Sequence, residues 1–246
     1  MEKNEYHAMA ALEESFWWYR ALHDFVLFNL EVELSGIKKP VIVDAGCGTG
    51  GMLAKIEKKL PEAVLLGFEY DTSALSYAVQ KTRADLFNAS VNSWPLADDT
   101  VDLVVSMDVM YHQNVNEQQF LGEVFRCLKP GGVLLMNLPA FNWMRSAHDR
   151  QVHTRSRYTT ASVEQLLTES GIFCEYAGYR NSLLFPLMVI HRLTAGQIKQ
   201  SSDVSEPNKW LNTFFYQINR FEQLLWKRGI RLPFGGSVWV KGVKPE

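Results

Sequence analysis

Residues 41–51 have the sequence VIVDAGCGTGG, in which an apolar run ends in an acid and leads into a turn dense in glycine. Residues 52–60 continue with apolar side chains at helical spacing, so the pattern predicts a strand, a turn and a helix. Glycine allows a positive φ and a close approach of the backbone to a ligand. The helix start offers free N–H groups to an electron-rich ligand. The stretch therefore predicts a cradle for a nucleotide.

The glycines of this turn fit two nucleotide-binding patterns. Gly46, Gly48 and Gly51 satisfy the dinucleotide fingerprint G-x-G-x-x-G. The same turn also satisfies acid-x-G-x-G-x-G, which adds Asp44 and Gly50. The acid favours the second pattern, because a carboxylate at this place would repel a pyrophosphate. It would attract a ligand that carries an ammonium and a sulfonium group and no phosphate, and S-adenosylmethionine is such a ligand.

The composition suits one globular domain with a full core. The chain has 246 residues, of which 47% are hydrophobic and 21% charged. A net charge of −2 gives no reason to expect a nucleic-acid partner. The N-terminus has no signal-peptide pattern, and the longest apolar run, residues 183–190, is too short to span a bilayer. Three scattered cysteines show no zinc spacing, so we expect a cytoplasmic protein without a bound metal.

A second predicted strand, residues 63–69, ends in Glu69, 23 residues after Gly46. This spacing brings a carboxylate to the tip of the neighbouring strand, where it can accept both ribose hydroxyls of a nucleoside. Tyr70 follows and offers a ring for stacking on adenine. Glu69 and Tyr70 are therefore expected in the cofactor site.

A fourth predicted strand ends near residue 106 and leads into MDVMYH at 107–112. Ligands of open α/β sheets lie outside the carboxyl ends of the strands, so Met107 and His112 are expected where a transferred methyl group meets its acceptor. A histidine packed by Tyr111 at a helix start is an equally simple interpretation of His112. The histidines that could act as a general base are His112, His148 and His153.

Residues 139–158 form a connection too long for a simple turn, and long loops in compact domains are usually functional. His148 precedes Asp149, but neighbours in sequence need not touch, so the two are not taken as a dyad. The arginines of this segment would suit a carboxylate or phosphate on the acceptor, or they lie in solvent. They are Arg145, Arg150, Arg155 and Arg157.

Residues 13–20, EESFWWYR, are unusually aromatic and precede a predicted helix; helical pattern covers residues 6–34 as a whole. Two interpretations stay open. The aromatic rings pack the helix onto the sheet, or the segment forms a lid over the cofactor. In the second case Tyr19 and Arg20 would meet the carboxylate of the methionyl group, and a tryptophan would shield the sulfonium.

These motifs together resemble the class I S-adenosylmethionine-dependent methyltransferases. The resemblance is carried by residues 41–51, Glu69, the segment around Asp102 and LKPGG at 128–132. Segments outside this core are similar to a bacterial subgroup of type 11/12. The resemblance implies an α/β, Rossmann-like doubly wound sheet of seven strands in the order 3-2-1-4-5-7-6, with the last strand antiparallel. It implies methyl transfer from S-adenosylmethionine but names no acceptor. We expect transfer to an oxygen or nitrogen of a small molecule by in-line displacement.

The family often closes its third strand with an aspartate that accepts from the adenine amino group. Here the strand predicted over 84–91 has Ser90 at the matching position, followed by Val91. A serine hydroxyl binds an amino group less strongly than a carboxylate, and Asn92 is a substitute. We therefore expect Ser90 and Val91 beside adenine, with weaker contacts than those to the ribose.

The expected organisation is a single domain with an N-terminal helical lid and a helical insertion before the last strand. Its parts are the lid (1–35), the cofactor-binding core (36–182), the insertion (183–230) and the closing strand (231–246). The apolar stripes of the insertion favour packing against the sheet. They also fit a cap over the acceptor, a homodimer face, or peripheral attachment to a membrane or a lipid-linked acceptor, which ranks last.

Two other functions compete with catalysis on a small-molecule acceptor. The chain could bind S-adenosylmethionine as a non-catalytic interaction module. An NAD-dependent dehydrogenase would share the glycine turn, but Asp44 and LKPGG at 128–132 speak against it.

Overall fold

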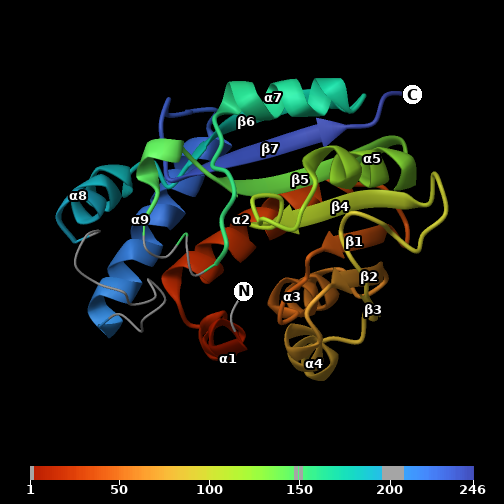
Figure 1. Ribbon diagram of the computed structural model, residues 1–246, viewed down its shortest axis with the longest axis horizontal. Coiled ribbons are helices and arrows are strands. Elements are labelled where there is room, and N and C mark those ends of the chain that lie inside the picture. The colour runs from red at the N-terminus through yellow and green to blue at the C-terminus, as the bar shows by residue number, and fades with distance from the viewer. Residues whose placement is uncertain (1–2, 147–148, 150–151, 196–207) are drawn as a thin grey trace.

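A seven-stranded sheet forms the centre of the molecule in the computed structural model, which describes residues 3–146, 149, 152–195 and 208–246 (Figure 1). The strand order is β3-β2-β1-β4-β5-β7-β6, and only β7 runs antiparallel to its neighbours. The strands are β1 (Val41–Ala45), β2 (Val64–Glu69), β3 (Asp85–Asn88), β4 (Val101–Met107), β5 (Leu128–Pro139), β6 (Phe173–Arg180) and β7 (Ser237–Val243). The predicted fold class and strand order are confirmed.

Helices cover both faces of this sheet. They are α1 (Lys3–Leu12), α2 (Trp17–Glu33), α3 (Gly51–Lys59), α4 (Thr72–Lys81), α5 (Glu117–Cys127), the short 3₁₀ helix η1 (Asn142–Met144), α7 (Thr160–Glu169), α8 (Phe185–Ala195) and α9 (Lys209–Lys227). One apolar core joins α5 and α7 to the sheet, and a second joins α2, α3 and the end of α9 to its other face. Because helices cover both faces of the sheet, a ligand can reach the sheet only at the ends of its strands.

The central strands are apolar on both faces because both faces are covered. In β1, Ile42 lies in the core with α2 and α3, whereas Val43 lies in the core with α5 and α7. Leu135 and Leu134 of β5 divide in the same way. Alternate side chains of a strand point to opposite faces, so a strand between two helix layers needs an unbroken apolar run.

The N-terminal region departs from the helical pattern expected over residues 6–34. The structure has two helices, α1 and α2, with a turn over residues 13–16 between them. α1 packs against α4, whereas α2 packs against α3 and α9. One straight helix could not reach both surfaces, and the turn brings Glu13 into the interior.

Two strand boundaries also differ from the expectation. β3 ends at Asn88, so Ser90 and Val91 lie in the loop that follows it. β5 begins at Leu128 directly after α5, so LKPGG opens the strand instead of preceding it. The glycines of that motif are held by the C-terminal segment, because Gly131 N donates to Lys244 O at 2.9 Å and Gly132 O accepts from Lys244 N at 3.0 Å.

Candidate functional site

The turn between β1 and α3 requires glycine at several positions. Gly46, Gly48 and Gly50 have φ angles of 84°, 53° and 82°. A Cβ on Gly46 would lie 2.5 Å from Val109 Cγ2, and one on Gly50 would lie 2.8 Å from the Ala78 Cα. The backbone therefore comes close to the segment after β4 and to α4, and only glycine fits this path.

Glu69 is fixed beside this turn by backbone N–H groups. Its Oε2 accepts from Gly48 N at 3.0 Å, and its Oε1 accepts from Asp71 N at 2.8 Å. β1 and β2 are parallel neighbours, so the ends that carry Asp44 and Glu69 meet at one edge of the sheet. The carboxylate expected to hold the ribose thus lies next to the glycine turn.

A third carboxylate at the turn escaped the sequence reasoning. Glu13 is only 1% exposed, accepts from Thr49 Oγ1 at 2.7 Å, and forms an ion pair with Lys81. A Cβ on Gly51 would lie 2.3 Å from Glu13 Oε2, so the Glu13 carboxylate lies directly against the first residue of α3. The aromatic rings dominate the pattern of residues 13–20, and nothing in the sequence indicates that Glu13 is buried.

Asp44 and Glu69 give the turn an acidic edge, whereas the charge of Glu13 is balanced by Lys81. Burial, together with Glu69 and Glu13, raises the pKa of Asp44 from its ordinary value to about 7. Burial also raises the pKa of Glu69. This donor set suits a ligand with ammonium and sulfonium groups and ribose hydroxyls, and it repels a pyrophosphate. The residues present therefore fit S-adenosylmethionine.

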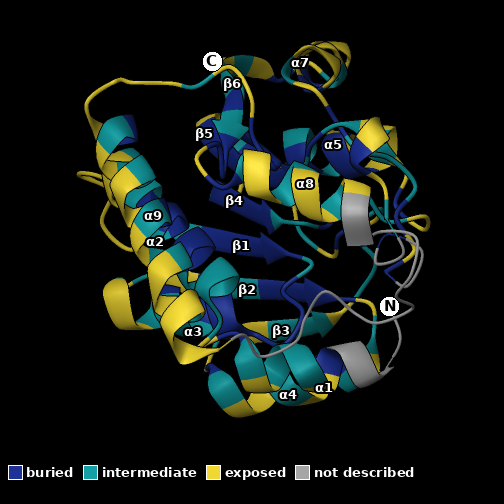
Figure 2. Ribbon diagram, turned by 90° about the vertical axis from the view of Figure 1, so that its left-hand side faces the viewer, coloured by how far each residue is buried: buried dark blue, intermediate teal, exposed yellow. Residues whose placement is uncertain are grey.

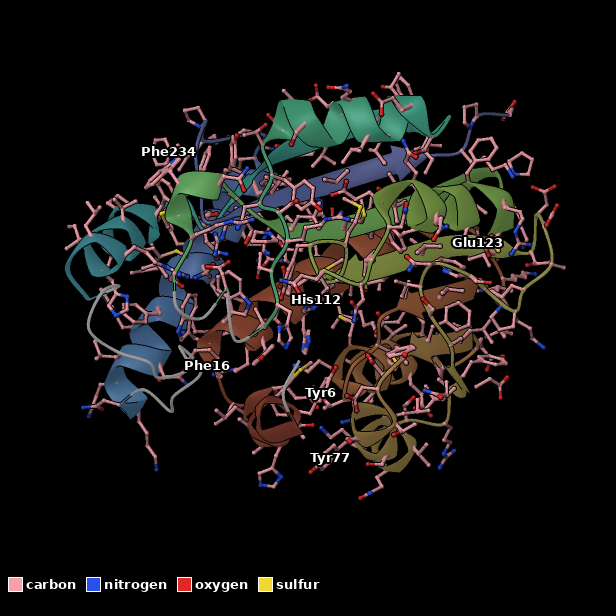
Figure 3. The ribbon with its side chains drawn as sticks, viewed as in Figure 1. Tyr6, Phe16, Tyr77, His112, Glu123 and Phe234 are labelled. Carbon is pink, nitrogen blue, oxygen red and sulfur yellow. The ribbon has the colours of Figure 1, made fainter. Side chains whose placement is uncertain are left out.

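Helix α1 covers this turn (Figure 3). Tyr6 is buried, and its pKa is raised first by burial and then by Glu69 and Asp71, so its hydroxyl faces the acidic edge. The Met9 methyl group would lie 2.9 Å from a Cβ on Gly48. The lid predicted over residues 1–35 includes α1, and closure of this region over the cofactor stays a prediction.

The aromatic segment does two things in the structure. Trp17 packs edge-on against Phe215 with ring centroids 5.6 Å apart, and the Arg20 guanidinium lies 3.9 Å from the centre of the Tyr216 ring. These contacts join α2 to α9. Burial raises the pKa of Tyr111, and Asp108 and Tyr19 add to the rise, so Tyr19 lies near the segment after β4. The roles of Tyr19 and Arg20 at the methionyl carboxylate stay predictions.

On the adenine side the structure places the predicted residues at the β2 and β3 ends. Tyr70 is 75% exposed next to Glu69, where its ring is accessible for stacking. Ser90 Oγ accepts from Asn92 N at 3.2 Å, and Val91 is buried. The Asn92 side chain bonds a backbone carbonyl and a backbone N–H of the segment before α5, both at 2.9 Å. Asn92 therefore holds this loop, and the adenine contacts stay predictions.

Asp108, directly after Met107 at the end of β4, is a second acid without a role in the sequence reasoning. It has a φ of 58° and accepts from Asn137 Nδ2 at 2.9 Å. Asn137 Oδ1 in turn accepts from the buried Arg180 at 3.0 Å. Burial raises the pKa of Asp108 to about 6. The available signal was an acid at the carboxyl end of an apolar strand, as at Asp44.

His112 is held in one tautomer. Its Nδ1 lies 2.8 Å from the Val152 carbonyl oxygen, which can only accept, so Nδ1 carries the hydrogen and Nε2 carries the lone pair. Burial lowers the pKa of His112 to about 4, which leaves the imidazole neutral at pH 7. The Tyr111 ring also packs on it, with centroids 4.3 Å apart. Packing against Tyr111 is therefore compatible with an unprotonated Nε2.

The other two candidate bases differ from His112. His148 lies outside the described residues. The side chain of His153 is exposed, and its backbone oxygen accepts from Gln113 N at 3.0 Å. Among the described candidates, His112 alone is part of the packed segment at the β4 end.

The arginines of residues 139–158 that the structure describes bind other parts of the protein. Arg157 pairs with the buried Asp149 through an Nε–Oδ1 contact of 2.8 Å, and Arg155 lies 2.8 Å from Glu117. Burial opposes ionisation of Asp149, but Arg157 holds its pKa below the ordinary value. Arg145 donates to the Arg155 carbonyl, and Arg150 is outside the described residues. The interpretation of these arginines as solvated groups is wrong for Arg157, whose side chain is 8% exposed, whereas Arg145 is exposed and Arg155 is half-buried.

Comparison with known proteins agrees with this site. Residues 42–132 match a family model described as a methyltransferase domain. A probable S-adenosylmethionine-dependent methyltransferase of Mycolicibacterium smegmatis is 29% identical over 66% of this chain and 62% of its own length. A malonyl-[acyl-carrier protein] O-methyltransferase of Coxiella burnetii is 29% identical over 52% of this chain and 45% of its own. The matches thus span about half to three fifths of these relatives.

A solved structure shows the same fold over nearly the whole length. It is a chain of the Haloferax volcanii complex between the Trm112 methyltransferase activator and a methyltransferase, with a TM-score of 0.64 and 19% identity. The match covers 99% of this chain and 97% of that one. With the acidic glycine turn and the strand order, these findings identify residues 42–132 as a methyltransferase domain in a chain with the fold of the class I S-adenosylmethionine-dependent methyltransferases, with S-adenosylmethionine as the cofactor.

Proposed function

We propose that the protein transfers the methyl group of S-adenosylmethionine to an oxygen or nitrogen of a small molecule by in-line displacement. The observation that carries the proposal is His112, a neutral imidazole with its lone pair on Nε2, three residues after Val109, which contacts the glycine turn. A hydroxyl or protonated amine must lose a proton during methylation, and this nitrogen can accept it.

The cofactor supplies an activated methyl group, so the protein has to position the acceptor and exclude water. Asp44 and Glu69 bind the cationic and ribose parts on one side. Tyr6 on α1 covers that site. On the other side Tyr111 and Asp108 offer hydrogen-bonding groups that orient an acceptor near His112 Nε2.

An oxygen acceptor is the first to test. The Coxiella burnetii relative is named for methyl transfer to oxygen, although its match covers less than half of its length. The carboxyl of Asp108, whose pKa is raised to about 6, lies in the network with Asn137 and Arg180 and would bind a hydroxyl as donor or acceptor.

The test is a turnover assay with isotopically labelled S-adenosylmethionine and separate panels of phenols, alcohols, carboxylic acids and amines. We expect labelled product and stoichiometric S-adenosylhomocysteine from an oxygen or nitrogen acceptor, measured by mass spectrometry. Product formed only on carbon would contradict the proposal. Tight binding of S-adenosylhomocysteine without transfer to any class, or to any cell metabolite extract, would instead favour a non-catalytic module.

A further inference from the structure

Exposed apolar side chains gather at the last two helices of the chain. Of the eighteen large apolar residues that are exposed in the described part of the structure, eleven lie between residues 183 and 234. The sequence favoured packing as the role of the apolar stripes in this insertion. Among the described residues only one side of α9 packs against the rest of the protein, so the other side needs a separate explanation.

Helix α9 presents an apolar face to solvent. Trp210, Phe214, Phe221 and Leu224 are 84%, 58%, 52% and 47% exposed. Their spacing of four, seven and three residues places them on one side of a helix. The opposite side is the one that packs on α2, where Trp226 lies 5.0 Å from the Phe25 ring.

Helix α8 adds apolar side chains on the same side of the molecule. Leu187 is 50% exposed and Leu193 is 74% exposed. Figure 2 shows α9 along the left edge and α8 nearer the centre, each with exposed turns on the side that faces the viewer. We define the α8–α9 face as Leu187, Leu193, Trp210, Phe214, Phe221 and Leu224. An exposed apolar surface of this kind on a folded domain marks an interaction site.

The segments that carry the α8–α9 face are basic, and one of their cations, Arg220, lies 3.8 Å from Asp24 of α2. Residues 183–195 and 208–234 contain six lysines or arginines and one glutamate, a formal charge of +5, whereas the whole chain carries −2. Lys209, Arg220 and Lys227 lie eleven and seven residues apart, which places them along one edge of the apolar face. The one acid, Glu222, is turned inward and accepts from Leu183 N at 3.0 Å.

This pattern determines which partner fits. A second copy of the chain, paired by a two-fold axis, would place these cations opposite one another, with no acid of the same helix to meet them. An anionic lipid surface supplies negative charge at the edge and apolar volume under it, and tryptophan is favoured at such a boundary. Among the described residues, no helix is long and apolar enough to cross a membrane.

We propose that the α8–α9 face binds the surface of an anionic membrane. The apolar side chains enter the region between the headgroups and the acyl chains, and Lys209, Arg220 and Lys227 bind lipid phosphates. This contact is peripheral, and it does not depend on which molecule accepts the methyl group.

The experiment is co-sedimentation of the purified chain with vesicles of phosphatidylcholine alone and of phosphatidylcholine with 30% phosphatidylglycerol. We expect binding to the anionic vesicles that weakens with salt, and at least tenfold weaker binding to the neutral ones. Trp210→Ser/Phe221→Ser and Lys209→Glu/Lys227→Glu should each reduce anionic binding roughly tenfold or more.

Matched controls separate this face from general effects. Val79→Ser/Phe173→Ser removes two apolar side chains of similar exposure, 63% each, elsewhere on the molecule. Lys58→Glu/Arg83→Glu changes the net charge by the same amount at distant exposed sites. Both should bind vesicles as the unaltered chain does. Equal loss in the controls would overturn the proposal, as would no binding to anionic vesicles. So would a dimer in light scattering that Trp210→Ser/Phe221→Ser converts to monomer.

Discussion

The two ends of the site are built in different ways. On the cofactor side, Asp44, the glycine turn and Glu69 lie within 30 residues of one another and on adjacent parallel strands. On the proposed acceptor side, groups from distant segments meet, as in the bonds from Asn137 to Asp108 and from Arg180 to Asn137. The first arrangement is a local motif, whereas the second exists only after the sheet has assembled. Short-range sequence therefore specifies the cofactor side, whereas the proposed acceptor side depends on tertiary packing.

The largest effect that would test this comparison is expected at Glu69. In Glu69→Gln one carboxylate oxygen becomes an NH₂ group, which cannot accept from the ribose. Losing one or two charge-assisted hydrogen bonds should weaken S-adenosylhomocysteine binding roughly 10²–10⁴-fold. Isothermal titration calorimetry measures this change. Glu62→Gln, at an exposed position before β2, serves as the control and should leave the affinity unaltered. An unaltered affinity in Glu69→Gln would remove this residue from the cofactor site.

The next effect is expected at His112. His112→Asn removes the basic Nε2, so the turnover number with a hydroxyl acceptor should fall about 100-fold, while S-adenosylhomocysteine binding persists. Because the pKa of His112 is lowered to about 4, the base form is present above that value, and activity should not fall through a histidine titration between pH 6 and 7. His153→Asn is the matched exposed control. If His112→Asn and His153→Asn have equal turnover numbers, His112 is not a general base and positioning of the acceptor is sufficient for catalysis.

A smaller effect is expected at the lid. Glu13→Gln breaks the ion pair with Lys81 and weakens the bond from Thr49, so α1 should detach more often from the glycine turn. We expect about tenfold weaker cofactor binding and faster amide hydrogen exchange in α1. Glu14→Gln changes the exposed neighbour and should do neither. If Glu13→Gln and Glu14→Gln bind the cofactor equally well, Glu13 stabilises the turn but does not hold α1 over the cofactor site.

The smallest effect is the pH dependence that Asp44 should impose. With a pKa of about 7 in the ligand-free protein, its ionised fraction rises several-fold between pH 6 and pH 8, and binding of a cationic ligand should strengthen by less than tenfold. Calorimetry in buffers of different ionisation enthalpy would detect the proton released. Binding that is flat over this range would contradict the raised pKa.

The same group has an opposite effect on stability. Its folded pKa lies above its unfolded value, so the native state binds more protons and the free energy of unfolding falls as pH rises from about 4 to about 7. Asp44→Asn has no carboxyl group to ionise, so its free energy of unfolding does not fall in this way as pH rises. The ligand-free variant should therefore gain thermal stability over the unaltered chain at pH 8 and less at pH 5, measured by calorimetric melting.

Much of the cofactor side could be predicted from sequence because its signals are periodic or local. The apolar run of β1, the glycines and the acids at strand ends each identify themselves within a few residues. Glu13 was not predictable in this way. It stands among exposed polar residues in the sequence and becomes buried only because α1 and α2 turn at residues 13–16.

The acceptor side shows the opposite balance. The sequence identified His112 as a candidate but could not supply its tautomer, which depends on the Val152 carbonyl 40 residues away. It offered the arginines of residues 139–158 to the acceptor or to solvent, whereas Arg157 and Arg155 bind Asp149 and Glu117. Helical periodicity marked α9 as amphipathic but could not say which part of its apolar surface would be covered.

The sequence by itself determined the sheet order, through its resemblance to the methyltransferase family, and the cationic nature of the cofactor, through an acid next to a glycine turn. These properties depend on residues that are near one another along the chain. The tertiary structure alone determined the third carboxylate at the turn, the base form of His112 and the outward face of α9. Each of these depends on which distant segment covers a side chain, and that choice fixes its burial, its hydrogen-bond partner and its charge.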